Sequence, residues 1–320
     1  MIPLLQDISA IGIVPVIKLD HPDNAVPLVR ALADGGLPCA EITFRSDAAE
    51  ESIRRVAREC PDVLVGAGTV LTTEQADRAW AAGAKFIVSP GLNPKVVSHC
   101  LERGMPILPG ATSPSEIETA LEFGLDVVKF FPAEQSGGIN FIKALSAPYT
   151  GLRFMPTGGI SAKNLNDYLS FDKIVACGGS WMVPGDLIAA KDFDGITALT
   201  RQAVQTMLGF EILHIGVNAG GEEDAAQIAK VFCDLFGVGA KVGNSSIFSG
   251  SLVEVMKGNG RGTKGHIGIG VNSLPRARRY LERKGYKFDE STLKLDEKGR
   301  PTICYIEGEY GGFAVHFNQK

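Results

Sequence analysis

Short apolar runs rich in Val, Ile and Phe alternate with longer amphipathic stretches over residues 1–208. The short runs predict strands, and the stretches between them predict helices because apolar residues recur at helical spacing. Helix boundaries are also marked: Ser113-Pro114-Ser115-Glu116 is typical of a helix start, and Gly83 and Gly124 follow two helix ends. The eight predicted strands are residues 11–17, 39–44, 64–69, 86–89, 105–109, 126–131, 153–156 and 173–177.

This alternation predicts repeated βα units and an α/β fold with a parallel sheet. Eight units in roughly 200 residues correspond to a small TIM (β/α)8 barrel. A doubly wound open sheet would alternate in the same way, but no Gly-x-Gly-x-x-Gly motif follows the first predicted strand. The sequence therefore favours a barrel domain over residues 1–208.

The pattern changes after a predicted helix at 193–208, which Gly209 ends. From residue 210 onward paired strands and glycine turns dominate, and one block occurs twice. Leu213-His214-Ile215-Gly216-Val217-Asn218 recurs about 50 residues later as Gly265-His266-Ile267-Gly268-Ile269-Gly270-Val271-Asn272. Each copy leads into a predicted helix, at 222–236 and 274–284, and then into short strands. Residues 210–320 are therefore predicted as a smaller α+β domain of two β-α-β-β-β units.

Composition and charge narrow the range of partners. The 320 residues are 45% hydrophobic and 21% charged, which is ordinary for a globular protein. The net charge of −4 predicts neither nucleic acid nor an anionic membrane as a partner. The chain begins without a basic leader, and no apolar run is long enough to cross a bilayer. The six cysteines form no Cys-x-x-Cys pair, which predicts reduced thiols and a cytoplasmic protein.

Lys129 lies in the apolar stretch Val127-Val128-Lys129-Phe130-Phe131, which reads as a buried strand. Burying an ammonium ion costs free energy, so a lysine in such a place usually has its pKa lowered toward the neutral amine. A neutral amine can attack a carbonyl carbon and form a Schiff base. The alternative is a lysine whose stem lies in the strand while its ammonium group reaches water.

Other chemically useful residues follow the ends of the predicted strands, where a TIM barrel has its active site. The second strand closes with Glu41-Ile42-Thr43-Phe44-Arg45, in which Glu41 and Thr43 share a face. The seventh and eighth strands run into Thr157-Gly158-Gly159 and Gly178-Gly179-Ser180. Backbone N–H groups of such glycine pairs can face an anion, and these two loops are the frequent phosphate site of the fold. The alternative is that the glycines serve only as tight turns.

Residues from about 5 to 208 resemble the 2-keto-3-deoxy-6-phosphogluconate (KDPG) and 2-keto-4-hydroxyglutarate (KHG) aldolase family, which consists of class I enzymes on a TIM barrel. The resemblance rests on seven blocks in this order: Ile13-Val14-Pro15-Val16, Glu41-Ile42-Thr43-Phe44-Arg45, Val65-Gly66-Ala67-Gly68-Thr69-Val70, Ser89-Pro90-Gly91, Lys129-Phe130-Phe131-Pro132-Ala133-Glu134, Pro156-Thr157-Gly158-Gly159-Ile160 and Gly178-Gly179-Ser180-Trp181.

The resemblance implies a role for each candidate residue. Lys129 would form the Schiff base at the C2 keto group, and Glu41 would act as general acid and base. The alternative for Glu41 is a structural carboxylate paired with Arg45. The implied substrate-binding residues are Arg45 and Thr69 at the carboxylate, Pro90 and Phe131 as walls, and Thr157, Gly158, Gly159, Gly179 and Ser180 at the distal phosphate.

The family also implies the ligands and the assembly. The substrate would be a phosphorylated keto acid, cleaved to pyruvate and glyceraldehyde 3-phosphate, or 4-hydroxy-2-oxoglutarate, cleaved to pyruvate and glyoxylate. The aldolase would need no metal or other cofactor, because the iminium replaces the metal of a class II enzyme. Family members are usually homotrimers. Lys18, at the end of the first strand, is a second amine near the mouth, and we interpret it as a solvated residue.

The duplicated second domain resembles a vicinal-oxygen-chelate (glyoxalase-like) module. The resemblance implies a divalent metal site at His214, Glu254, His266 and His316, with Zn, Ni, Mn or Fe suited to these ligands. His316 departs from the more usual carboxylate. The alternative is that the histidines are structural and only form hydrogen bonds at strand ends.

Three further hypotheses remain open from the sequence. One is a bifunctional protein with a metal-dependent glyoxalase-like activity in the second domain. Another is a phosphosugar-binding barrel without aldolase turnover. A phosphosugar isomerase would share the phosphate loops but would not need an apolar-flanked lysine on the sixth strand.

Overall fold

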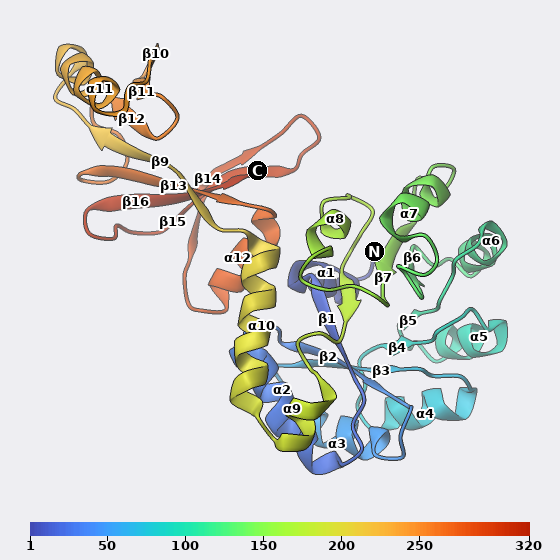
Figure 1. Cartoon of the computed structure of the whole chain (residues 1–320). Helices are drawn as coiled ribbons and strands as arrows, with labels where there is room; N and C mark the ends of the chain where they lie inside the picture. Colours follow the sequence, from blue (N-terminus) through green and yellow to red (C-terminus); the bar gives the residue numbers. More distant parts are fainter. The chain divides into compact units, whose positions relative to one another are not determined.

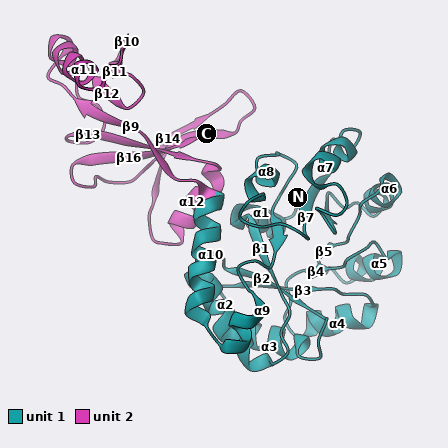
Figure 2. Ribbon diagram, in the orientation of Figure 1, with its two compact units in different colours: residues 1–207 teal, residues 208–320 magenta.

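The computed structural model describes residues 1–320 and divides into two compact units, Met1–Met207 (unit 1) and Leu208–Lys320 (unit 2) (Figure 2). No helix in either unit combines the length and the apolar character that crossing a bilayer requires.

Unit 1 alternates strands and helices along the chain (Figure 1). Its strands are β1 (Ile13–Ile17), β2 (Cys39–Thr43), β3 (Leu64–Gly68), β4 (Ile87–Val88), β5 (Ile107–Leu108), β6 (Val127–Phe130), β7 (Arg153–Pro156) and β8 (Cys177–Gly179). Its helices are α1 (Pro3–Ile11), the 3-10 turn η1 (Pro22–Asn24), α2 (Ala25–Asp34), α3 (Ala49–Glu59), α4 (Thr73–Ala81), α5 (Pro94–Glu102), α6 (Pro114–Glu122), α7 (Gly138–Ser146), α8 (Leu165–Leu169), α9 (Gly185–Ala190) and α10 (Phe193–Leu208).

The strands of unit 1 form two parallel ladders, β5-β4-β3-β2-β1-β8 and β6-β7. Isolated bridges join the ladders on both sides, between Gly110 and Lys129 and between Thr157 and Gly178. The pairing therefore passes around all eight strands, and the helices lie outside them (Figure 1). Unit 1 is a barrel-like α/β unit, in agreement with the predicted alternation.

Local sequence explains why these elements form. All five residues of β2 are buried, which is typical of parallel strands that have helices on one face and a filled interior on the other. Helix α6 starts with a capping box, in which the Ser113 side chain accepts from the Glu116 N–H and the Glu116 side chain accepts from the Ser113 N–H. The predicted start of this helix is thus confirmed.

Only the seventh predicted strand, 153–156, has the observed bounds; most of the others are one or two residues shorter at an end, and two differ for a clear reason. The first strand begins at Ile13, because Ile11 is the last residue of α1, a helix that the prediction missed and that Gly12 ends at φ 81°. The eighth strand is Cys177–Gly179 rather than 173–177, because β1 pairs with these three residues. The glycine pair after the predicted strand therefore belongs to the strand itself.

Unit 2 is a separate, sheet-rich region. Its strands are β9 (Glu211–Asn218), β10 (Ala240–Val242), β11 (Ser246–Ser249), β12 (Val253–Met256), β13 (Gly265–Val271), β14 (Phe288–Leu295), β15 (Pro301–Ile306) and β16 (Phe313–Gln319), and its helices are α11 (Glu222–Phe236) and α12 (Leu274–Glu282). The eight strands form one sheet in the order β10-β11-β12-β9-β13-β16-β15-β14. The two duplicated segments meet at its centre, where β9 and β13 pair antiparallel.

Candidate active site

Lys129 on β6 and Glu41 on β2 face each other inside unit 1. The two residues are 5% and 0% exposed, and Lys129 Nζ lies 3.3 Å from Glu41 Oε1. Val128 and Phe130 are fully buried on the opposite face of β6, because side chains alternate along a strand. The Lys129 amine therefore lies within the protein beside a carboxylate and does not reach bulk water along the strand, as the alternative would require.

Strand β3 makes room for the Glu41 carboxylate. A Cβ atom on Gly68 would lie 2.2 Å from Glu41 Oε1. The carboxylate therefore fills the space that the side chain of any residue other than glycine would need at position 68. Thr69, which follows, has a left-handed φ of 56°, a conformation uncommon for a residue other than glycine. Sequence reasoning did not assign this role to Gly68, and the Gly-Ala-Gly run was its only signal.

Arg45 is anchored to a neighbouring residue rather than to Glu41. Its Nε donates to Thr43 Oγ1 at 3.1 Å, and the Thr43 hydroxyl donates to the Ile17 carbonyl at 2.8 Å. Glu41 instead contacts Lys129. The alternative of a structural Glu41–Arg45 pair is therefore not what the structure shows, and the terminal guanidinium nitrogens are available to a ligand.

All eleven predicted catalytic and substrate-binding residues line one cavity of about 280 Å³. They are Glu41, Arg45, Thr69, Pro90, Lys129, Phe131, Thr157, Gly158, Gly159, Gly179 and Ser180. Val16, Thr43 and Ile160 also line the cavity, and the prediction did not include them. The position of Thr43 two residues after Glu41 was a signal for its place, because the two share a face of β2.

Several polar groups around this cavity have no partner within the protein. Glu41 Oε2 and Thr157 Oγ1 are buried without a hydrogen bond. The backbone N–H groups of Gly158, Gly159 and Ile160 likewise form no hydrogen bond within the protein. Buried polar groups are normally satisfied, so Glu41 Oε2 and Thr157 Oγ1 indicate a polar ligand that supplies their missing partners. Three successive N–H groups make a concave site suited to an anion.

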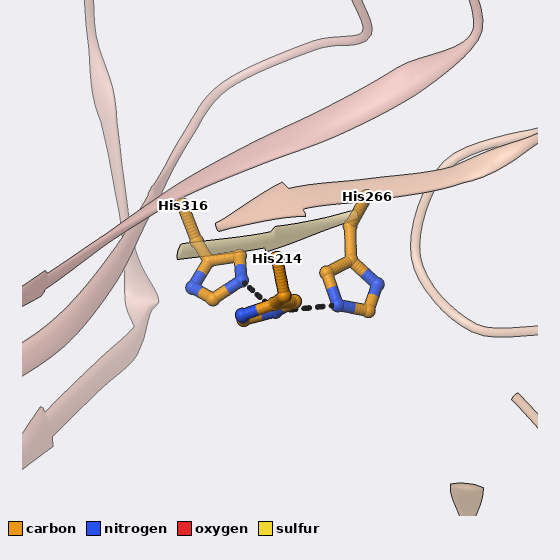
Figure 3. Close-up of side chains that lie close together, drawn as sticks. All are labelled: His214, His266 and His316. Carbon is orange, nitrogen blue, oxygen red and sulfur yellow. Dashed lines mark hydrogen bonds between the residues drawn. The ribbon is translucent and has the colours of Figure 1, made fainter. Parts of the chain in front are cut away.

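A second cluster lies in unit 2, where His214 on β9, His266 on β13 and His316 on β16 converge (Figure 3). His214 Nε2 is 3.1 Å from His266 Nε2 and 3.3 Å from His316 Nε2. Glu254 on β12 completes the group, with Oε2 3.1 Å from His266 Nε2 and 3.5 Å from His214 Nε2. The four residues named from the sequence thus lie together, although up to 102 residues separate them along the chain.

Burial disfavours the charged form of two of these histidines. It lowers the pKa of His316 to about 4, and it also lowers the pKa of His214, with the neighbouring histidines adding to both effects. The hydrogen bond with His266 holds the pKa of Glu254 below its usual value, and the Ser246 hydroxyl donates to the other carboxylate oxygen at 2.6 Å. Neutral imidazoles and an ionised carboxylate are the forms that bind a divalent metal.

Two glycines make room for the imidazoles. In the antiparallel pairing of β9 with β13, His266 lies opposite Gly216, and His214 lies opposite Gly268. A Cβ on Gly216 would lie 2.1 Å from the His266 ring, and a Cβ on Gly268 would lie 2.3 Å from the His214 ring. Each copy of the repeated His-Ile-Gly triplet therefore supplies a histidine and the space for the histidine of the other copy.

Comparison with known proteins adds to this geometry. A sequence profile described as "KDPG and KHG aldolase" matches residues 6–199. A 2-dehydro-3-deoxy-phosphogluconate aldolase of Treponema pallidum (strain Nichols) is 55% identical over 205 residues, which cover 64% of this chain and 98% of that protein. The KHG/KDPG aldolase of Escherichia coli (strain K12) is 42% identical over 193 residues, covering 60% of this chain and 91% of that protein.

Solved structures are similar over the same share of the chain. The KDPG aldolase of Legionella pneumophila, with pyruvate captured as a covalent carbinolamine, has a TM-score of 0.61 and 36% identity over 62% of this chain and 97% of that one. The KDPG aldolase of Zymomonas mobilis ZM4, solved with 3-phosphoglycerate, has a TM-score of 0.59 and 36% identity over 62% of this chain and 94% of that one. The profile match lies within unit 1.

Proposed function

Because the chain belongs to the KDPG and KHG aldolase family and is therefore a lyase, we propose that it cleaves 2-keto-3-deoxy-6-phosphogluconate to pyruvate and glyceraldehyde 3-phosphate, 4-hydroxy-2-oxoglutarate to pyruvate and glyoxylate, or both. We assign this activity to residues 1–208 as a TIM barrel domain. The observation that carries the proposal is a buried amine, Lys129 Nζ, 3.3 Å from Glu41, the one carboxylate among the residues lining the cavity.

The proposed reaction uses the Lys129 amine as nucleophile. It adds to the C2 keto carbon to give a carbinolamine, and loss of water gives an iminium. Glu41 removes the proton of the C4 hydroxyl, the C3–C4 bond breaks, and its electron pair moves onto C3 and the iminium to form an enamine. The aldehyde leaves, C3 takes a proton, and water releases pyruvate from Lys129. The carbinolamine of pyruvate in the Legionella pneumophila enzyme supports this chemistry.

The remaining cavity residues are proposed to hold the substrate. Arg45 and Thr69 would bind the carboxylate next to the keto group, since the terminal nitrogens of Arg45 are available as a planar fork. Pro90 and Phe131 would form walls; the Phe131 ring centroid lies 5.2 Å from Lys129 Nζ.

The distal phosphate is assigned to the other end of the cavity, at Thr157, Gly158, Gly159, Gly179 and Ser180. The unused N–H groups of Gly158, Gly159 and Ile160 support this assignment. The 3-phosphoglycerate in the Zymomonas mobilis structure is a ligand of the same chemical kind. The iminium serves as the electron sink, so the aldolase reaction requires no metal or other cofactor.

Borohydride trapping tests the proposal. Wild type incubated with pyruvate and sodium borohydride should gain a covalent label at Lys129, and Lys129→Ala should lose both the label and pyruvate release from either substrate. Lys18→Ala is the matched control. Lys18 is half-exposed and pairs with Asp20, so the Lys18→Ala protein should still be labelled at Lys129. A labelled Lys129→Ala protein would contradict the proposal. Binding of substrate without turnover by the wild type would favour the phosphosugar-binding alternative.

We also propose that the protein is a cytoplasmic homotrimer. The six cysteines are free, which suits a reducing compartment. The family resemblance supports the trimer. Light scattering on the purified chain should give three times the monomer mass of 34.0 kDa, and a monomer or dimer would contradict it.

A second function is proposed for unit 2, which we assign to residues 210–320 as a glyoxalase-like domain with two β-α-β-β-β units. His214, Glu254, His266 and His316 would hold a divalent metal such as Zn, Ni, Mn or Fe. Their imidazole and carboxylate atoms converge from four strands, and the His316 atom that meets the cluster is Nε2. When bound, the ion would supply Lewis-acid activation of an oxygen ligand. The protein would then be bifunctional.

Metal analysis of the full-length chain tests this second function. Protein dialysed against Zn²⁺ and then desalted should retain about one ion per chain. The double variant His214→Ala/His266→Ala, treated in the same way, should retain none. His99→Ala serves as control, because His99 pairs with Asp77 in unit 1. A metal-free wild type would support the structural alternative for the histidines.

A further inference from the structure

The loop that follows β7 carries the three unused N–H groups and is held in place from its own side by Asn164. The Asn164 side chain accepts from the Ser161 N–H at 2.8 Å and donates to the Gly159 carbonyl at 3.2 Å. This arrangement engages the Gly159 carbonyl, while the N–H groups of residues 158–160 remain free at the cavity.

The segment after β6 holds the same loop from the other side. The backbone N–H of Ala133 donates to the Thr157 carbonyl at 2.8 Å, and that of Glu134 donates to the Gly158 carbonyl at 3.1 Å. The stem of the Glu134 side chain lies directly against Gly159, where an added Cβ would be 2.5 Å from Glu134 Cγ. Gly159 also has a left-handed φ of 78°. The position of this glycine thus depends on where Glu134 places its side chain.

Tyr168 determines that placement. Its hydroxyl donates to Glu134 Oε1, and the tyrosine is 1% exposed on α8, the helix that directly follows the loop. Burial raises the pKa of the Tyr168 phenol, and the bond to Glu134 adds to the shift, so the hydroxyl remains a donor at neutral pH. Glu134 itself is exposed, so without this bond its side chain would have many accessible rotamers.

We propose that Glu134 and Tyr168 are positioning residues for phosphate recognition: Tyr168 fixes the Glu134 side chain beneath Gly159, and Glu134 thereby holds the N–H groups of residues 158–160 in the geometry that receives the phosphate. Neither residue lines the cavity, so neither would touch the substrate. The inference rests on the proposed function, because it assumes that the distal phosphate binds at this loop.

The test compares a phosphorylated with an unphosphorylated substrate. Tyr168→Phe should raise KM for 2-keto-3-deoxy-6-phosphogluconate about tenfold, because the hydrogen bond that orders Glu134 is lost. For 4-hydroxy-2-oxoglutarate, which has no phosphate, kcat and KM should remain within about twofold of wild type. Borohydride trapping with pyruvate should proceed at the wild-type rate, since Lys129 and Glu41 are unaffected.

Two further variants separate positioning from folding. Glu134→Gln keeps an acceptor for the Tyr168 hydroxyl and should retain the wild-type KM, whereas Glu134→Ala should reproduce the Tyr168→Phe effect. Glu134 is exposed, so neither change removes a buried side chain. Tyr149→Phe is the matched control, because Tyr149 donates to Glu118 Oε1 at 3.2 Å outside the cavity. Loss of this hydrogen bond should leave kcat and KM unchanged for both substrates.

Equal effects on both substrates, or no effect of Tyr168→Phe and Glu134→Ala on the phosphorylated one, would overturn the inference and leave the proposed function standing. A wild type that cleaves neither substrate and is not trapped with pyruvate would instead remove the proposed function, and the inference with it.

Discussion

Lys129 stands out in the sequence because burying an ammonium group among Val and Phe residues costs free energy unless a partner compensates its charge. In the structure the Lys129 amine lies beside Glu41, although 88 residues separate the two along the chain. The strand ends predicted that a carboxylate, a guanidinium and an amine would meet at one mouth. Which of them touch was decided by side-chain packing: Glu41 contacts Lys129, and Arg45 contacts Thr43.

At the same scale, Gly216 and Gly268 should be required for metal binding in unit 2. A methyl group at Gly268 would lie 2.3 Å from the His214 ring, so Gly268→Ala must displace that imidazole. We expect Gly268→Ala and Gly216→Ala each to weaken Zn²⁺ binding by about tenfold or more, as measured by titration calorimetry. Gly258→Ala is the control, because an added Cβ there meets no atom within 4 Å. Unchanged affinity in both variants would show that the histidines tolerate the displacement.

The depressed pKa of His316 predicts that metal-free unit 2 loses stability in mild acid. Burial lowers this pKa from 6.5 to about 4, so below pH 6.5 the unfolded chain binds a proton that the folded unit excludes. The free energy of unfolding is therefore highest above pH 6.5. It decreases as the pH falls from 6.5 through the folded pKa of about 4, by up to about 3 kcal/mol in all.

Hydrogen exchange of β13 and β16 peptides in EDTA-treated protein at pH 7 and pH 5 measures this effect, with rates corrected for intrinsic pH dependence. Tryptophan fluorescence is unsuitable, because Trp80 and Trp181 both lie in unit 1. His316→Gln should show a smaller loss of protection between the two pH values. A loss equal to that of the wild type would refute the assignment to His316.

At the scale of elements, the site depends on how neighbouring strands fit together. Glu41 extends from β2 across β3, and this is allowed only because β3 ends in Gly68. The loop after β7 is held by the segment after β6, and Tyr168 on the helix α8 donates to Glu134 of that segment. In both cases the position of one segment depends on a residue of a neighbouring element.

Gly68→Ala should therefore impair the chemical step. The new methyl group would lie 2.2 Å from Glu41 Oε1, so the carboxylate must move away from the cavity or from Lys129. Because general acid–base catalysis contributes about 10²–10⁴-fold to rate, we expect kcat to fall at least about tenfold. Single-turnover pyruvate release measures this effect. Gly91→Ala, where an added Cβ meets nothing within 4 Å, should remain near wild type, and a fully active Gly68→Ala would contradict the placement of Glu41.

At the scale of the whole molecule, two compact units share one chain, and each has its own cluster of functional groups. The Treponema pallidum relative is covered over 98% of its length by 205 residues of this chain. A chain of that size thus suffices for the family fold, and unit 2 is an addition to it.

Residues 1–209 alone should consequently retain aldolase activity. All the residues that line the cavity lie in unit 1, and Gly209 ends α10 with a left-handed φ of 56°. We expect kcat/KM for the preferred substrate to stay within about twofold of the full chain in a coupled pyruvate assay. A soluble, folded fragment with a large loss of activity would show that unit 2 contributes to catalysis.

The sequence by itself determined the features that depend on local patterns. The βα alternation predicted a barrel-like α/β unit, and helices at 193–208 and 222–236 have the predicted bounds. The lysine, the strand-end motifs and the repeated His-Ile-Gly triplet marked the residues that the structure brings into two clusters. These predictions succeeded because periodicity, capping and the cost of burying charge act within short stretches of chain.

Only the tertiary structure decided what depends on register and packing. The eighth strand was predicted at 173–177, but its pairing with β1 extends it over Gly178 and Gly179. The roles of Gly68, Gly216 and Gly268 follow from neighbours on adjacent strands, and the Tyr168–Glu134 contact joins residues 34 positions apart. These neighbours cannot be read from one sequence, because the register between strands in the folded protein decides which distant residues lie side by side.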